Sequence, residues 1–174
     1  MSALPHARRR ELARVTSQDD AHERIRDLLS GVVGAILEEE PALIAFSDHR
    51  PQRDRPSGLT WSGIETLCHV SAMLAADAAP HLDESARERL VAAAGDALRF
   101  FGLPVGQQIP EDPSIDGAWA WEGEQGERVE LLFGVRVCVR AYSAPFLPGS
   151  LQAPRTTSPA SPLSPPTPPP RPLR

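Results

Sequence analysis

The fold of this chain is decided by residues 115–142, which have the sequence IDGAWAWEGEQGERVELLFGVRVCVRAY. Residues 115–121 and 128–133 are rich in apolar and aromatic side chains, and a polar link with two glycines separates them. One further glycine separates the second segment from a third, residues 135–142. Short apolar segments bounded by glycine and polar residues predict strands, so this stretch indicates three consecutive strands.

Polar and apolar side chains alternate along these strands, which is the period of a strand with one buried face. Arg136, Cys138 and Arg140 are expected on the face that stays open to solvent. The side chains expected on the buried face are Val129, Leu131 and Phe133 in the second strand and Val135, Val137 and Val139 in the third. The alternation predicts an antiparallel sheet that is covered on one side only.

Two amphipathic helices are predicted upstream of these strands. The first begins after Ser17 and ends before Pro41, and the second begins after Asp83 and ends at Gly102. Their apolar residues recur three and four positions apart: Ile25, Leu28, Leu29, Val32, Val33, Ile36 and Leu37, then Ala86, Leu90, Val91, Ala94, Leu98 and Phe101. We therefore expect an α+β fold in which two main helices pack on one face of the antiparallel sheet.

The remaining segments have weaker signals. Residues 42–46 fit a helix or a strand, and residues 47–58, with two prolines and a glycine, predict a loop that precedes a short strand at 59–61. Residues 64–79 indicate a strand followed by an alanine-rich loop or helical turn, and residues 105–114 predict a loop.

The length of 174 residues suits one domain, which we assign to residues 16–148. Residues 1–15 predict a disordered basic arm. Residues 149–174 consist mainly of Pro, Ser, Thr and Arg, and such a segment buries too little apolar surface to offset its ordering entropy. A disordered, proline-rich tail is therefore expected at the C-terminal end.

The charged residues exclude several kinds of chemistry. All 18 basic residues are Arg, and the absence of Lys excludes a P-loop lysine and a Schiff-base lysine. Residues 16–150 contain 11 Arg and 22 acidic residues, a net charge of −11. An acidic body argues against nucleic-acid binding, which needs a basic surface. A chain rich in Arg, Ala and Pro that lacks Lys and Asn suggests a GC-rich bacterial genome.

Signals for export are weak in this sequence. No run approaches the roughly 20 apolar residues of a membrane span. Three arginines at residues 8–10 resemble the start of a signal peptide, but residues 16–26 after them are mostly polar, where a signal peptide needs an apolar core. The chain as written is expected in the cytoplasm, and in the cell envelope if the true start lies upstream.

The possible ligands for a metal are scattered along the chain: His49, Cys68, His69 and His81, with Asp48 or Asp83 nearby. None of them has the spacing of a known metal motif, so each ligand would come from a separate loop. The sequence therefore predicts no metal site and no cofactor.

Two cysteines leave two alternatives open. Cys68 and Cys138 are either a single disulfide, if the domain is exported, or two buried thiols. Cys138 lies between Arg136 and Arg140, and two cations on one face would lower its pKa and favour the reactive thiolate. The arginines equally fit the solvent-exposed face of a strand, without any role in thiol chemistry.

Trp119 and Trp121 are two residues apart on a predicted strand, so they share a face. They are candidates for an aromatic platform that binds a sugar or a protein partner. The alternative is that the pair packs against a helix.

The order of several motifs resembles a known family. GLTW at residues 58–61, Cys68 shortly after, FFG at residues 100–102 and paired strands ending at Tyr142-Ser143 are similar to small actinobacterial LppA-like lipoproteins. These are cell-envelope proteins of undefined activity, and the resemblance covers residues 21–148. It implies no catalytic residues and no cofactor. The sequence departs from the family in lacking a lipidated cysteine and a cysteine after Ser143, where a partner for Cys68 is expected.

Together these features indicate a non-catalytic binding or envelope-associated module that uses the free face of its sheet or the Trp119/Trp121 region. A protein partner fits this interpretation and nucleic acid does not. The alternative is a small hydrolase or thiol-dependent enzyme that uses Cys138 or a site at His69 and His81.

Overall fold

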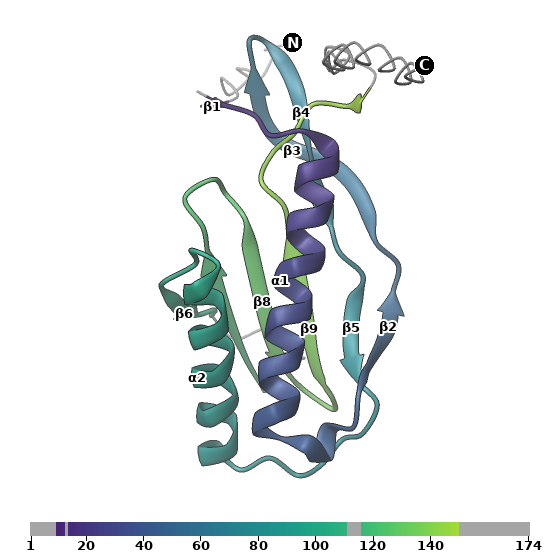
Figure 1. Cartoon of the computed structure of the whole chain (residues 1–174), viewed down its shortest axis with the longest axis vertical. Helices are drawn as coiled ribbons and strands as arrows, with labels where there is room; N and C mark the ends of the chain where they lie inside the picture. Colours follow the sequence, from purple (N-terminus) through teal and green to yellow (C-terminus); the bar gives the residue numbers. More distant parts are fainter. Residues whose placement is uncertain (1–9, 13, 111–115, 150–174) are drawn as a thin grey trace, which may run out of the picture.

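The computed structural model describes residues 10–12, 14–110 and 116–149 (Figure 1). Within these residues the elements are β1 (Arg10–Glu11), α1 (Gln18–Glu39), the short 3-10 helix η1 (Pro41–Leu43), β2 (Phe46–Arg50), β3 (Arg53–Trp61), β4 (Ile64–Val70), β5 (Met73–Ala76), α2 (Glu84–Phe100), β6 (Gly106–Gln108), β7 (Gly117–Glu122), β8 (Arg128–Phe133) and β9 (Val137–Tyr142).

The described strands form one sheet in the order β1-β3-β4-β9-β8-β7-β6, with β5 joining β2 to β9. Strands β2 to β9 pair in antiparallel fashion, and only β1 runs parallel to its neighbour, β3. Both long helices lie on the same face of this sheet, and no helix of the described residues covers the other face, here called the open face (Figure 1). The predicted α+β fold, with two helices on one face of an antiparallel sheet, is therefore confirmed.

The two helices begin where their capping residues predict. The Ser17 hydroxyl accepts a hydrogen bond from the backbone N–H of Asp20 at 3.0 Å, and the Asp83 carboxylate accepts one from the N–H of Ala86 at 2.7 Å. Helix α2 ends before Gly102, whose positive φ of 84° is the left-handed conformation that glycine adopts at little cost. These local signals fix the helix bounds independently of the sheet.

The core lies between the helices and the sheet. Apolar side chains from one stripe of each helix meet every second side chain of β8 and β9, and the fully buried members include Ile25, Leu28, Val32, Ile36, Leu90, Leu98, Val129, Leu131 and Val139. The alternation predicted for β8 is confirmed. Val135 is an exception, because it is 93% exposed and precedes β9 in the turn after β8. The prediction that placed it on the buried face is wrong.

The predicted loop over residues 47–58 is wrong, because β2 and most of β3 occupy it. Pro56 is tolerated in β3 because this strand lies near the edge of the sheet, where β1 covers only Leu59 and Thr60. The pairing of β3 with β4 is irregular between Pro56 and Thr60, and Gly58 there has a φ of +81°. Proline and glycine thus mark an irregular edge strand here.

Two further segments form strands that the sequence did not predict. The alanine-rich part of residues 64–79 is the strand β5, and residues 106–108 form β6 within a predicted loop. Gly106 is required in β6, because a Cβ atom at this position would collide with the Trp121 indole. Residues 111–115 lie outside the described part.

At the N-terminal end, Arg10–Glu11 pair with Leu59 and Thr60, so this part of the predicted basic arm is a short strand. Residues 1–9 and 13 of the predicted arm and the tail from residue 150 lie outside the described residues.

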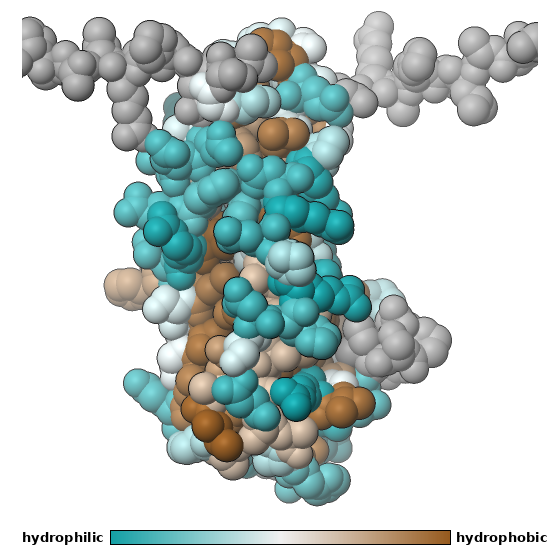
Figure 2. All heavy atoms as spheres, turned by 90° about the vertical axis from the view of Figure 1, so that its right-hand side faces the viewer, coloured by the Kyte–Doolittle hydropathy of each residue, from teal (hydrophilic) through white to brown (hydrophobic). Residues whose placement is uncertain are grey.

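Hydrophilic residues cover much of the side of the molecule that carries β2 and β3, and hydrophobic residues gather along its lower half (Figure 2). Four of the five residues of β2 are exposed, and they are polar or charged. Exposed polar residues on an edge strand oppose pairing with a second chain.

Candidate functional site

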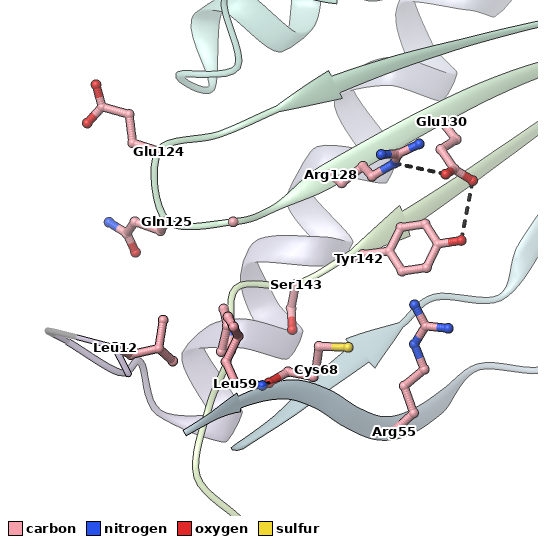
Figure 3. A pocket seen from close by; sticks show the side chains of 13 residues that line it. Leu12, Arg55, Leu59, Cys68, Glu124, Gln125, Arg128, Glu130, Tyr142 and Ser143 are labelled. Carbon is pink, nitrogen blue, oxygen red and sulfur yellow. Dashed lines mark hydrogen bonds and ion pairs between the residues drawn. The ribbon is translucent and has the colours of Figure 1, made fainter. Parts of the chain in front are cut away.

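The open face of the sheet contains a groove of about 620 Å³ between the β7–β8 turn and the β3–β4 hairpin (Figure 3). Both apolar and polar side chains line it. They include Leu12, Arg55, Leu59, Cys68, Glu124, Arg128, Glu130 and Tyr142. The groove thus collects side chains from four strands and one turn.

A buried carboxylate organises this groove. Glu130 is only 6% exposed, and its two oxygens accept hydrogen bonds from Nε of Arg128 at 2.9 Å and from Nη2 of Arg140 at 2.6 Å. The Tyr142 hydroxyl donates a third hydrogen bond at 3.3 Å. Glu130 and Arg140 are direct cross-strand partners in the β8–β9 register, which explains why they meet. A buried charge with such partners fixes the positions of the arginines around it.

Tyr142 lies between two guanidinium groups. Those of Arg55 and Arg140 lie 5.3 and 5.1 Å from the centre of its ring, within cation–π range. Burial raises the pKa of Tyr142, and the negative charge of Glu130 raises it further, while the two arginines act in the opposite direction. Arg55 has no carboxylate partner among the described residues, so its charge is positioned by an aromatic ring and remains available to a ligand.

A second hollow of about 820 Å³ lies lower on the same face. Its lining includes His49, Arg50, Met73, Leu132, Arg136, Cys138 and Arg140. Burial raises the pKa of Cys138, and the charges of Arg136 and Arg50 offset this effect only in part. The predicted decrease of this pKa is therefore wrong, because desolvation of the thiolate outweighs its attraction to the cations.

The hollows of the open face are lined by more basic than acidic residues. Among the described residues that line these two hollows and a smaller one beside them, six are Arg and two are acidic: Arg50, Arg53, Arg55, Arg128, Arg136 and Arg140, against Glu124 and Glu130. The residues that line these hollows carry a net charge of +4, in contrast to the −11 of residues 16–150, and one of the six arginines, Arg128, also pairs with Glu122 at 2.8 Å. Positive charge is concentrated on one side of an acidic protein.

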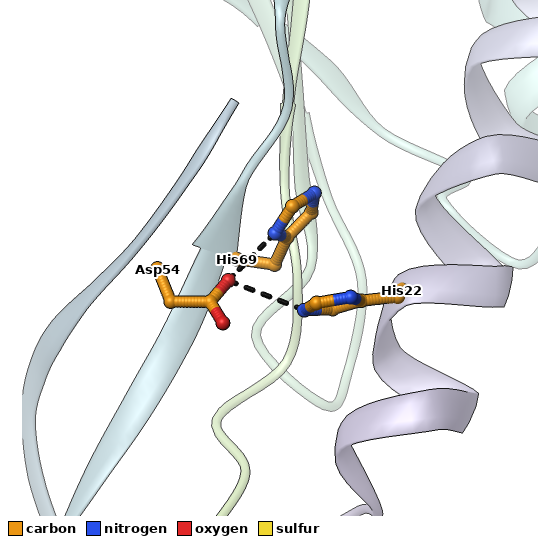
Figure 4. Close-up of side chains that lie close together, drawn as sticks. All are labelled: His22, Asp54 and His69. Carbon is orange, nitrogen blue, oxygen red and sulfur yellow. Dashed lines mark hydrogen bonds and ion pairs between the residues drawn. The ribbon is translucent and has the colours of Figure 1, made fainter. Parts of the chain in front are cut away.

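A different cluster lies on the helix side, between α1 and the β3–β4 hairpin (Figure 4). Oδ1 of Asp54 lies 3.2 Å from Nε2 of His22 and 2.7 Å from Nδ1 of His69. The two imidazole rings are 4.0 Å apart, centre to centre. His69 is 5% exposed, whereas the side chains of His22 and Asp54 are 33% and 27% exposed. The cluster joins three elements at the edge of the core.

The residues expected from the sequence lie in separate places. Trp119 and Trp121 stack with ring centres 6.4 Å apart, on the helix side of β7. Trp121 is 2% exposed and lies against Gly95 of α2 and Gly106 of β6, which fits packing on a helix, whereas Trp119 is only partly buried.

The two cysteines are both free thiols, one in each hollow of the open face. Val70 pairs with Tyr142, so Cys68 and Cys138 lie about six residues, or roughly 20 Å, apart along the strands. A disulfide needs Cα atoms within about 7 Å, so these two residues cannot pair in this fold.

His69 and His81 do not form one site. His69 contacts His22 in the first turns of α1, whereas His81 lines a hollow with Leu43, beyond the other end of that helix. Helix α1 has 22 residues and is about 33 Å long. His69 instead joins His22 and Asp54, which sequence reasoning missed because these residues have no motif spacing.

Neither a protein-family model nor a curated protein sequence matches the chain. Two crystal structures have a similar fold. A DUF4853 family protein from Actinomyces odontolyticus is 15% identical with a TM-score of 0.55, over 76% of this chain and 70% of that one. LppA from Mycobacterium tuberculosis, a provisionally assigned lipoprotein, is 11% identical with a TM-score of 0.54, over 80% of this chain and 87% of that one.

At this level of identity the likeness shows the fold alone, so the resemblance to LppA-like proteins is supported at the level of the fold. None of the described helices is long and apolar enough to cross a membrane.

Proposed function

We propose that this protein is a non-catalytic binding module that holds an anionic ligand on the open face of its sheet. The observation that carries the proposal is the set of six arginines that line the hollows of this face, where the lining includes only two acidic residues. Such a local excess of positive charge on an acidic protein attracts and orients negatively charged partners.

The arginines are held in place before any ligand binds. Glu130 fixes Arg128 and Arg140 by direct hydrogen bonds, and the Tyr142 ring supports Arg55. A planar guanidinium presents parallel N–H donors that match a carboxylate or a phosphate group. Because these side chains are already ordered, binding loses less conformational entropy than it would with free arginines.

We further propose that the protein works at the cell envelope. The sequence resembles LppA-like lipoproteins, and the fold is similar to that of LppA. Intact mass with and without thiol alkylation, on protein from its native host, tests this location. Extra mass at the N-terminal end supports the envelope, whereas an unmodified chain that starts at Met1 or Ser2 contradicts it.

Fluorescence anisotropy with a labelled oligoglutamate peptide and co-sedimentation with phosphatidylglycerol vesicles test the binding proposal in two arms. The double variant Arg50→Ala/Arg55→Ala should lose most binding of at least one probe, and binding should weaken as the salt concentration rises. Arg99→Ala is the matched control, because Arg99 forms an exposed ion pair with Asp96 on α2. Equal binding by the double variant and the control would refute an anion site on this face.

A further inference from the structure

We infer that His22, Asp54 and His69 form a binding site for a divalent transition-metal ion, with Zn²⁺ as the probe. The site lies on the helix side of the sheet, so it is separate from the arginines of the open face. Its three residues come from α1, β3 and β4, and they are 32 and 15 positions apart in the sequence.

The distances suit a shared ion. Nε2 of His22 and Nδ1 of His69 lie 3.2 and 2.7 Å from Oδ1 of Asp54, and one ligand atom from each of the three residues lies within 4.8 Å of the others. Zinc binds imidazole nitrogen and carboxylate oxygen at about 2.0–2.2 Å, so tetrahedral ligand atoms lie about 3.4 Å apart. Side-chain shifts on the order of 1 Å therefore bring all three atoms to bonding distance, and the ion would replace the hydrogen bonds at Oδ1 of Asp54.

The surrounding structure already positions two of the ligands. The backbone N–H of His69 donates to the Ser143 hydroxyl, and the Ser143 N–H donates to the His69 carbonyl, both at 2.9 Å. The Gln18 side-chain amide donates to Oδ2 of Asp54 at 3.3 Å, which leaves Oδ1 facing the two histidines. The backbone bonds fix the strand that carries His69, and the Gln18 contact is of the kind that orients ligating carboxylates in known metal sites.

The kind of ion follows from the ligand atoms. Two imidazoles and one carboxylate suit Zn²⁺, Co²⁺, Ni²⁺ or Fe²⁺, whereas Mg²⁺ and Ca²⁺ prefer oxygen ligands alone. His22 and Asp54 are partly exposed, so an ion can enter from solvent and keep water as a further ligand. Because the ligands belong to α1 and to the β3–β4 hairpin, a bound ion fastens the hairpin to the start of the helix.

Isothermal titration of the tag-free full chain with Zn²⁺ tests the inference, with Mg²⁺ and Ca²⁺ for comparison. We expect one Zn²⁺ per chain and no measurable binding of the other two ions. A free Zn²⁺ concentration of about 100 times its Kd should raise the melting temperature of the protein by an amount on the order of 5 °C. Binding of Co²⁺ gives an independent visible absorption spectrum that reports nitrogen and oxygen ligands.

His22→Ala and Asp54→Asn should each weaken Zn²⁺ binding by about tenfold or more, because each removes a ligand. His22 lies on the helix surface, so its loss leaves the fold intact even where the buried His69→Ala variant does not fold. His49→Ala, His81→Ala and Cys138→Ala are matched controls outside the cluster. Zn²⁺ binding that survives in His22→Ala, or that disappears in a control, would overturn the site.

Discussion

The helix side and the open side of this sheet carry different kinds of side chain, although the same strands form both. On the helix side, β8 and β9 bury Val129, Leu131, Phe133, Val137 and Val139 in the core, each at most 4% exposed. On the open side, the same strands present charges, a thiol and a phenol beside the apolar Leu132: Arg128, Glu130, Cys138, Arg140 and Tyr142. Neighbouring residues of one strand therefore belong either to the core or to the proposed binding face. Substitutions on the helix side should lower stability, and substitutions on the open side should affect binding more than stability.

Adjacent leucines in β8 give the sharpest test of this difference. Leu131→Ala should lower the free energy of unfolding by about 2–5 kcal/mol, because Leu131 is fully buried and its loss leaves a cavity. Leu132→Ala should cost only about 1 kcal/mol, because Leu132 faces the lower hollow of the open side. Urea denaturation of both variants measures the difference, and equal losses would contradict the assignment of the faces.

A pair of glycines tests the packing on the helix side. Gly106→Ala should cost about 1–3 kcal/mol, because the new methyl group meets the buried Trp121 indole. Gly134→Ala serves as the control, since nothing lies within 4 Å of the added atom in the exposed turn. If thermal unfolding showed the two variants to be equally stable, the close contact between β6 and Trp121 would be wrong.

The ion pairs of the open face should matter more than those on the helix surface. Arg140→Met should cost about 1–2 kcal/mol, because it removes one partner of the buried Glu130 carboxylate while Arg128 remains. Arg89→Met breaks an exposed pair with Glu39 and should cost less than about 1 kcal/mol. Chemical denaturation measures the free energy of unfolding of both variants. A larger loss in Arg89→Met than in Arg140→Met would contradict the expected order.

The smallest expected effect is the raised pKa of Tyr142, which can be followed by absorbance because Tyr142 is the single tyrosine of the sequence. Its absorbance should change with a midpoint above the ordinary pKa of 10.0, and Glu130→Gln should lower that pKa. Burial likewise raises the Cys138 pKa above its ordinary 9.0. As the pH rises past these ordinary values, the unfolded chain loses its protons first, so the free energy of unfolding should fall.

A Tyr142 titration midpoint at or below 10.0 would show that burial and the charge of Glu130 do not raise the pKa of this residue. Cys138→Ala should in turn reduce the loss of stability that begins near pH 9.0, and an unchanged slope would contradict the raised thiol pKa.

The helices and the central strands could be predicted because their signals are local. Ser17, Asp83 and Gly102 mark helix ends through their own hydrogen bonds and backbone angles, and the alternation along β8 identifies its buried face. Strand β2 and residues 53–58 of β3 were missed because proline and glycine resemble a loop, whereas the end of β3 at residues 59–61 was predicted. The position of β3 near the sheet edge permits Pro56.

The candidate sites could be predicted only in part. Alternation placed Arg136 and Arg140 on the open face, but Arg55 belongs to the segment that predicted a loop. The contact of His22 with Asp54 and His69 depends on how α1 docks against the β3–β4 hairpin. No spacing in the sequence encodes that docking, so the cluster becomes visible only in three dimensions.

The most direct test of the central claim is an NMR titration of the ¹⁵N-labelled protein with the oligoglutamate peptide. We expect shifts for the side-chain Nε–H groups of the open-face arginines and for amides of β3, β8 and β9, with α1 and α2 unchanged. Shifts confined to the helices, or none up to millimolar peptide while phosphatidylglycerol vesicles also fail to bind, would contradict an anion-binding role for the open face.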